Sequence, residues 1–497
     1  MLTHTQRNTD GGTPPGRSAR HAQLRILPLV GLIFFSVSGG PFGLENAVGG
    51  AGAGMTLAML LLVPLVYGIP CALMVAELGT ALPLKGGFYS WVKVGLGPRA
   101  AFAKGMWVWM AACLSTSLFP IIFADYLAQW VPALARGNNA LLTLFGGAIS
   151  IDGHWVAALC FMVPLAWLNS RGAHVVGRAT LVMMVFVLAP FVVMAVLAAF
   201  RVIRHPQAGE VAGFTVNGAG ALGSAGVALG VILWCYSGWD APSPVLNQVA
   251  DPGRTLRRAL LWSVPLIILS YVVPVVAALA SGLHAGRPEL WGGGDFAAAA
   301  ALLGGSWLKS LVTIGAVVST VGLFSSLLIP ASQTPSLMAR DGYLPQSLAR
   351  TSPRFGTPVR SIVVCCLIFA VFCSMEFTVV IDAAVLISLG GLMLEFASLV
   401  VLRRRHPDLP RPFRVPGGTA GLVLVVAGPA AVTVWMIWST WHYKPLSFWI
   451  GVVYLAAGGV LYPLAKRLGT REPEPADLGS ADLGPAADRV KADLARR

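Results

Sequence analysis

Long apolar segments recur along the whole chain, and little polar sequence separates them. A helix needs about 20 consecutive apolar residues to cross a bilayer. Twelve segments of about this length are predicted to span a membrane, at residues 24–49, 54–79, 100–131, 152–169, 175–202, 222–248, 258–281, 306–335, 359–376, 380–402, 420–440 and 446–465. Hydrophobic residues make up 56% of the 497 residues and charged residues 11%, which is far from the composition of a soluble domain. We therefore expect an all-α polytopic membrane protein.

Two of these spans are interrupted by residues that break helices. The first span contains the sequence SGGPFG, with its break at residues 38–41, and the span at 222–248 breaks at residues 236–238. Backbone without helical partners is tolerated at this depth only where it is buried in protein or lines a cavity. Broken helices in corresponding halves of a chain indicate the midplane binding site of a secondary transporter.

The net charge of +14 is distributed unevenly along the chain. If the twelve spans put both termini in the cytoplasm, 29 of the 35 Lys and Arg residues belong to the inner side and 6 to the outer side. Such an excess of basic residues on one side is the positive-inside asymmetry of membrane proteins. We interpret the charge as a topology signal and not as a nucleic-acid-binding surface. We expect a multi-pass protein of the cell (plasma) membrane with both termini in the cytoplasm.

The order of spans and tails predicts how the chain is divided. The parts are an N-terminal tail at 1–23, a transporter domain at 24–467 with repeats at 24–203 and 222–402 and two further helices at 420–465, and a C-terminal tail at 468–497. Each repeat opens with a broken helix. The C-terminal tail is charged, rich in Ala, Asp and Pro and poor in large apolar residues, so we expect it to be disordered.

Carboxylates inside a membrane are costly, so each is a functional candidate. Glu45 follows the first break and Asp240 the second. Either could bind substrate or a proton, or could only cap the helix that restarts there. Asp125 lies within the third span and could contact substrate or tie neighbouring helices together.

Three further acids lie in other spans. Glu77, near the inner end of the second span, is expected to pair with a basic inner-loop residue and to help hold the inner gate. Glu395, in the tenth span, could carry a proton or be a paired structural acid. Asp382 lies close to the outer end of the same span and is expected to face water.

The residue types around the breaks favour an amine substrate. Two or three carboxylates around one cavity suit an ammonium group, which compensates charges that would otherwise be desolvated. Tyr236 and Trp239 could add cation–π contacts. A zwitterionic amino acid would instead need backbone amides at the first break for its carboxylate. Sodium coupling could use Ser319 and Thr320 in the eighth span, but we expect protons to be the coupling ion.

Cysteine and histidine spacing argues against other chemistry. The seven cysteines lie in apolar segments without metal-ligand or redox spacing, and the eight histidines form no paired-ligand motif. We expect no metal and no cofactor. A membrane enzyme would need a nucleophile with its base or a metal set, and the sequence holds no GxSxG or HExxH motif. We therefore do not expect an enzyme.

Four loop motifs resemble those of the amino acid, polyamine and organocation transporter superfamily. They are AELGTALPLKGGFYSWVKVGLGP at 76–98, MARDGYLP at 338–345, TPVRSI at 357–362 and LRRRHPDLPRPFRVPG at 402–417. Four further segments are most similar to the branch that takes up polyamines and cationic amino acids. They are FFSVSGGPFGLE at 34–45, LFPIIFADYL at 118–127, LNSRGAHVVG at 168–177 and WDAPSPVLNQVADPGRTLRRAL at 239–260.

This resemblance implies a five-plus-five inverted repeat and alternating access, usually driven by a proton gradient. By position, it implies that the two broken helices hold the substrate. The residues concerned are Ser38, Gly39, Gly40 and Pro41 in the first helix and Tyr236, Ser237, Gly238, Trp239 and Asp240 in the sixth. Asn247 and Gln248 depart from the Gly-Glu pair that is common in relatives, so a cytoplasmic gate built on that glutamate is not expected here.

The function that follows is proton-coupled uptake of polyamines or cationic amino acids. A broad or neutral amino acid permease of the same fold is the alternative within this class. A transport-inactive sensor, or a subunit of a larger complex, is the alternative outside it.

The predicted topology can be tested by cysteine-accessibility labelling of intact cells. Arg403→Cys and a cysteine placed in the C-terminal tail should react with a membrane-impermeant maleimide only after permeabilisation, because both positions are predicted to be cytoplasmic. Asn138→Cys, in the predicted outer loop before the fourth span, is the control that should react without permeabilisation. Labelling of Arg403→Cys from outside would contradict the topology.

Overall fold

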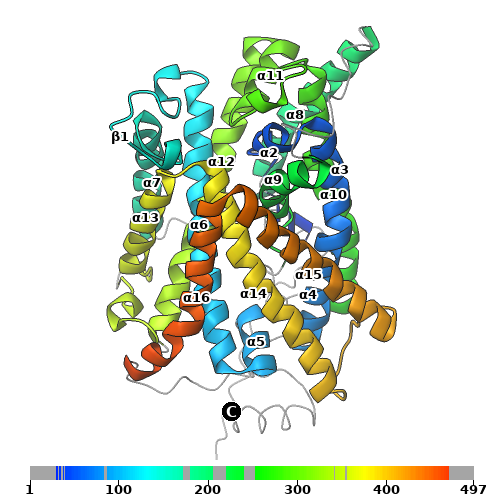
Figure 1. Cartoon of the computed structure of the whole chain (residues 1–497), viewed down its shortest axis with the longest axis vertical. Coiled ribbons are helices and arrows are strands. Elements are labelled where there is room, and N and C mark those ends of the chain that lie inside the picture. Colours follow the sequence, from blue (N-terminus) through cyan, green and yellow to red (C-terminus); the bar gives the residue numbers. More distant parts are fainter. Residues whose placement is uncertain are drawn as a thin grey trace, which may run out of the picture.

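The computed structural model describes residues 30–31, 33–34, 37–38, 40–82, 87–171, 180–204, 220–239, 252–340, 342–352 and 355–468. Each of the predicted spans coincides with a helix or with helical segments in these ranges (Figure 1). Eight of the described helices are long and apolar enough to cross a membrane. The prediction of an all-α polytopic membrane protein is confirmed. The two predicted tails lie outside the described residues, apart from Leu468.

The elements of the first half of the chain follow the predicted order of spans. They are α2 (Glu45–Ala51), α3 (Ala53–Val63), the π-helical turn η1 (Pro64–Gly68), α4 (Ile69–Ala81), α5 (Phe88–Leu96), α6 (Pro98–Ala128), η2 (Pro132–Leu134), β1 (Leu142–Leu144), η3 (Phe145–Gly147), β2 (Ile149–Ile151), α7 (Gly153–Ser170) and α8 (Thr180–Arg204).

The second half repeats this use of long helices. Its elements are α9 (Gly220–Cys235), α10 (Pro252–Ala280), η6 (Pro288–Leu290), α11 (Asp295–Gly304), α12 (Ser306–Arg340), η7 (Gln346–Ala349), α13 (Val359–Cys373), α14 (Phe377–Arg405), α15 (Gly418–Tyr443) and α16 (Pro445–Leu468).

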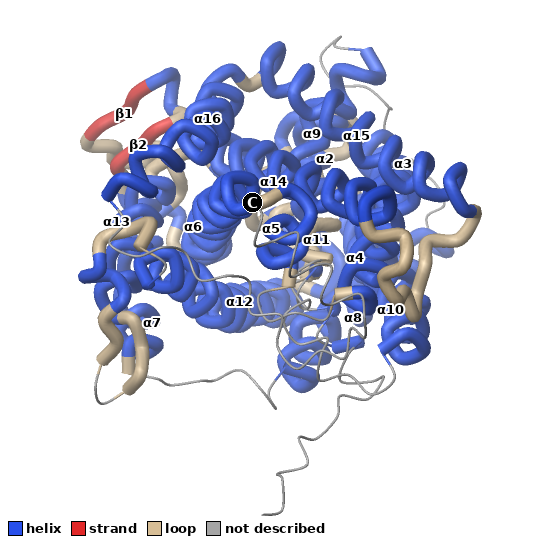
Figure 2. Tube along the Cα trace, turned by 90° about the horizontal axis from the view of Figure 1, so that it is seen from below, coloured by secondary structure: helices blue, strands red, loops and turns tan. Residues whose placement is uncertain are grey.

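The helices form one bundle with two distinct ends. In Figure 1 the upper end carries α2, α11 and β1, and the lower end carries α5 and the C-terminal end of α14. Figure 2 looks along the bundle from the lower end and shows α6 and α14 near its centre, with α7 and α13 side by side at one edge. Helix α6 packs against both α12 and α14. The positive-inside asymmetry predicts that the lower end is cytoplasmic.

Local sequence explains where individual helices begin. Pro98 occupies the first position of α6, where its missing N–H costs no hydrogen bond. Asp152 caps α7, because its carboxylate accepts a hydrogen bond of 3.0 Å from the N–H of Trp155. Strands β1 and β2 form an antiparallel hairpin in which Leu142 faces Ile151. This hairpin, between the third and fourth spans, was not predicted.

A cluster of charges at the lower end joins two of the sequence motifs. The buried carboxylate of Glu77, at the end of α4, accepts hydrogen bonds of 2.7 Å from Nε of Arg403 and from the N–H of Val415. Its other contacts are Nη2 of Arg403 and, at 3.5 Å, Nε of Arg411. The AELG segment is thus fixed to the loop after α14. The role of this cluster in a gate stays a prediction.

The prediction that Asp382 faces water was wrong. Its carboxylate is buried at the upper end of α14 and lies 2.5 Å from Nζ of Lys444, between α15 and α16. Lys444 also donates a hydrogen bond of 2.9 Å to the carbonyl of Val227 in α9. Two later helices therefore cover a residue that the span alone would leave at a water-exposed end.

Replacement of Glu77 by alanine is expected to destabilise the protein by about 3–5 kcal/mol, because Arg403 would then be a buried charge without its carboxylate. Thermal unfolding of the purified protein in detergent measures this loss. Glu289→Ala is the matched control, since Glu289 is exposed and its loss should cost no more than about 0.5 kcal/mol. Equal midpoints for the two variants would contradict the assignment.

Candidate functional site

The first span is broken by two glycines in a conformation that other residues rarely adopt. Gly40 has φ of 112° and Gly43 has φ of 98°, with Pro41 and Phe42 between them. A residue with a β-carbon would be strained at either glycine. Pro41 also lacks the N–H that would continue the helix. The chain becomes helical again at α2, which starts at Glu45.

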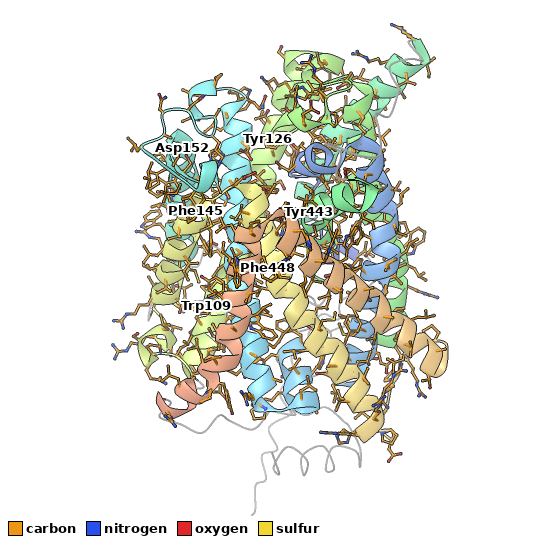
Figure 3. The ribbon with its side chains drawn as sticks, in the orientation of Figure 1. Trp109, Tyr126, Phe145, Asp152, Tyr443 and Phe448 are labelled. Atoms are coloured by element: carbon orange, nitrogen blue, oxygen red, sulfur yellow. The ribbon has the colours of Figure 1, made fainter. Side chains whose placement is uncertain are left out.

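Glu45 closes this break from inside the protein. Its fully buried carboxylate accepts a hydrogen bond of 2.7 Å from the N–H of Gly43 through Oε2. Through Oε1 it accepts one of 2.5 Å from the hydroxyl of Tyr126, which Figure 3 shows towards the upper end of α6. Both oxygens are therefore engaged within the protein. This geometry favours the capping role that was the alternative for Glu45.

The second break begins where α9 ends at Cys235. Ser237 lies just beyond it and donates a hydrogen bond of 2.7 Å from its hydroxyl to the carbonyl of Leu233. Gly238 has φ of 94°, which is outside the helical region. The hydroxyl of Tyr236 donates to the carbonyl of Leu60 in α3, at 2.7 Å. Asp240 lies outside the described residues, as does Gly39 in the first break.

Tyr271 connects the two breaks. From α10 its hydroxyl lies 2.8 Å from the carbonyl oxygen of Cys235 and 3.3 Å from that of Val37. It therefore donates to backbone at the end of α9 and reaches backbone beside the first break. Sequence reasoning missed this residue, because a tyrosine in an apolar span is usually a packing residue. Its only signal was a hydroxyl in the middle of such a span.

A cavity of about 730 Å³ lies between the breaks and extends towards the lower end of the bundle. The breaks contribute Val37, Gly40, Phe42, Cys235, Ser237, Gly238 and Trp239 to its wall. Helix α6 contributes Lys104, Val108, Ala111, Ala112, Ser115, Phe119 and Ile122. Opposite stretches of α12 and α14 complete much of the wall. The cavity is large enough for a small-molecule ligand.

The structure brings some of the predicted site residues to this cavity and keeps others away. On its wall are Gly40, Ser237, Gly238, Trp239, Ser319 and Thr320. Away from the wall are Ser38, Pro41, Glu45, Glu77, Asp125, Tyr236 and Glu395. The predicted ring of carboxylates is therefore not assembled from Glu45 and Asp125.

Asp125 ties helices together near the upper end. Its Oδ1 lies 2.9 Å from Nε2 of the buried His154 in α7. Its side chain also packs against the backbone of Gly293, where a β-carbon would come within 2.4 Å of Oδ2. These contacts agree with the alternative in which Asp125 ties neighbouring helices together.

The described part of the wall is mainly apolar and aromatic, with several hydroxyls. Tyr67, Phe119, Trp234 and Trp239 line it, and such rings attract organic cations. Lys104 is the one charged residue among the described wall residues, and it forms an ion pair with Glu395. Within the same ranges no group of three His, Cys, Asp or Glu side chains is placed to hold a metal ion. A wall of this composition is suited to binding a small organic molecule.

A comparison with family models decides the identity of the fold. The model described as amino acid permease matches residues 30–459, which include both breaks and the whole cavity wall. This chain belongs to that family. The permease is a transporter and not an enzyme.

Relatives of the permease include proteins with different named substrates. It is 34% identical over 424 residues to a polyamine transporter of Oryza sativa subsp. japonica, covering 85% of this chain and 75% of that protein. It is 32% identical over 463 residues to a polyamine transporter of Arabidopsis thaliana, covering 92% and 89%. A branched-chain amino acid permease of Bacillus subtilis is 24% identical over 379 residues, covering 74% and 77%.

Glu45→Ala is expected to lower the thermal midpoint of the permease, because Gly43 N–H and the Tyr126 hydroxyl would each lose a buried acceptor, at about 1–3 kcal/mol per group. Tyr126→Phe removes one of these contacts and should cost less. Glu45→Gln keeps one acceptor oxygen and should lie between Glu45→Ala and the wild type. An unchanged midpoint for Glu45→Ala, with uptake abolished, would contradict capping and favour a substrate or proton role.

Proposed function

We propose that this permease takes up polyamines or other organic cations by alternating access. The observation that carries the proposal is the meeting of both helix breaks at one aromatic-lined cavity. The names of the two plant relatives support polyamines as the substrate class. A cation in this cavity would be held by ring faces and by carbonyl oxygens freed at the breaks. The protein acts in the plasma membrane with both termini in the cytoplasm.

The packing around the cavity supports an inward-facing arrangement. Its wall reaches Phe88 in α5 and Thr334 near the lower end of α12. At the upper end, α2 packs closely on the segment that precedes α11. A β-carbon on Gly49 would lie 2.3 Å from the carbonyl oxygen of Trp291. Movement of α2 away from the segment that precedes α11 would open the cavity towards the upper end of the bundle.

Protons are the proposed coupling ion. Buried carboxylates are the groups that such coupling requires, and Glu395 is fully buried in the transporter core. Ser319 and Thr320, the residues of the sodium alternative, line the cavity. The hydroxyl of Thr320 donates a hydrogen bond of 3.0 Å to the carbonyl of Val317. That hydroxyl is therefore used within its own helix.

One observation favours a second candidate, a permease of neutral amino acids. The described wall residues include no carboxylate, so they offer no direct charge partner for an ammonium group. The name of the Bacillus subtilis relative agrees with this alternative. Asp240 lies outside the described residues. In our proposal, a carboxylate from Asp240 at the cavity distinguishes a permease of organic cations from a permease of neutral amino acids.

Uptake by the purified protein in proteoliposomes tests the proposal. An inward gradient of one pH unit supplies about 1.4 kcal/mol and should drive about tenfold accumulation of labelled putrescine for one proton per substrate, with the membrane potential clamped. A protonophore should abolish it, and removal of sodium should not. Strict sodium dependence would overturn proton coupling. Competition by leucine but not by spermidine or lysine would overturn the amine assignment.

A further inference from the structure

The cavity is much longer than a single charged group requires. Its lining residues on α6 run from Lys104 to Ile122, a rise of about 27 Å at 1.5 Å per residue. On α12 they run from Ser319 to Thr334, about 22 Å on the same basis. The breaks lie beside Ile122 and Phe119, so the lower part of the cavity is remote from them. Only a ligand long enough to reach from the breaks to Lys104 can use both parts at once.

A buried ion pair marks the lower part. Lys104 lines the cavity with a side chain that is only 3% exposed, and its ammonium contacts the carboxylate of Glu395 in α14. Glu395 is fully buried and does not line the cavity, so Lys104 stands between the carboxylate and the open space. The ammonium also lies 4.9 Å from the centre of the Phe88 ring.

The chemistry of this pair matches that of the proposed ligand. A lysine side chain is a primary ammonium on a flexible four-carbon stem, and putrescine is two such ammonium groups joined by the same four-carbon chain. A carboxylate that accepts the ammonium of Lys104 can therefore accept the ammonium of a polyamine with little change in geometry. Because the resting pair is neutral as a whole, it does not repel an approaching cation strongly.

We propose that Glu395 is the binding site for the distal ammonium of a long polyamine, and that Lys104 occupies this site until the ligand displaces it. The inference rests on the proposed function and adds a residue that determines selectivity by length. The proximal ammonium binds among the rings and carbonyls at the breaks. Displaced Lys104 turns its ammonium into the open cavity, while the ligand restores the charge pair that burial of Glu395 requires.

The proposal makes affinity depend on the distance between two ammonium groups. The measurement is inhibition of labelled putrescine uptake by α,ω-diamines of increasing length. A monoamine of equal length, tested beside each diamine, corrects for the added apolar surface. In the wild type, a diamine long enough to reach Glu395 should inhibit at a concentration lower by about tenfold or more than a short one, the effect of one charge-assisted hydrogen bond.

We call the factor by which a long diamine inhibits at a lower concentration than a short one the length gain. Variants of the pair should change the length gain in opposite directions. Lys104→Met removes the competing ammonium and should increase the gain. Lys104→Arg keeps a cation with a bidentate fork and should reduce it. The double variant Lys104→Met with Glu395→Gln removes both charges, so it leaves no unpaired buried ion and should abolish the gain.

The matched control is a second lysine–carboxylate pair of α14, whose carboxylate is buried. Lys444→Met with Asp382→Asn removes that pair, which does not line the cavity, and the length gain should equal that of the wild type. A full gain in the Lys104–Glu395 double variant would overturn the inference. So would an equal change for diamines of every length, which would assign the pair to coupling. Failure of the wild type to transport any amine would instead overturn the proposed function.

Discussion

Inside a bilayer every peptide group must find a hydrogen-bond partner within the protein, because lipid offers none. A helix meets this requirement by itself, and a broken helix does not. At the first break a carboxylate oxygen of Glu45 serves the N–H of Gly43, and at the second the hydroxyl of Tyr271 serves the carbonyl of Cys235. One of these partners comes from the helix that restarts after the break and the other from the neighbouring helix α10. Burial of Glu45 and the position of α10 follow from the same requirement.

Charges in the core obey a second constraint, which is that a buried ion needs a partner. Glu77 pairs with Arg403, Glu395 with Lys104 and Asp382 with Lys444. Each pair joins segments that are far apart in the chain. Asp382 and Arg403, the partner of Glu77, lie near opposite ends of α14, whereas the pair at Glu395 faces the cavity through its lysine. In our proposal, this difference in position separates the pairs that only hold helices together from the pair whose lysine a ligand displaces.

Sequence patterns predicted the spans well because hydrophobic length is a property of each segment alone. They also located the breaks, since SGGPFG cannot continue a helix. They could not place side chains whose surroundings come from elsewhere in the chain. Asp382 was expected to face water because Lys444, 62 positions later, could not be foreseen as its cover. The orientation of Asp125 towards His154, and the reach of Tyr271 to two backbone carbonyls, depend on helix packing that no local pattern contains.

Tyr271 has one proton and two carbonyl neighbours. It is closer to Cys235 than to Val37, at 2.8 against 3.3 Å, so the bond is shared unequally between the two broken helices. If one broken helix slid slightly past the other, the Tyr271 hydroxyl could move its hydrogen bond from the carbonyl of Cys235 to that of Val37. At no stage would the hydroxyl lack an acceptor. All three residues line the cavity. In the proposed transport cycle, this shared hydroxyl would let the two breaks shift at little energetic cost.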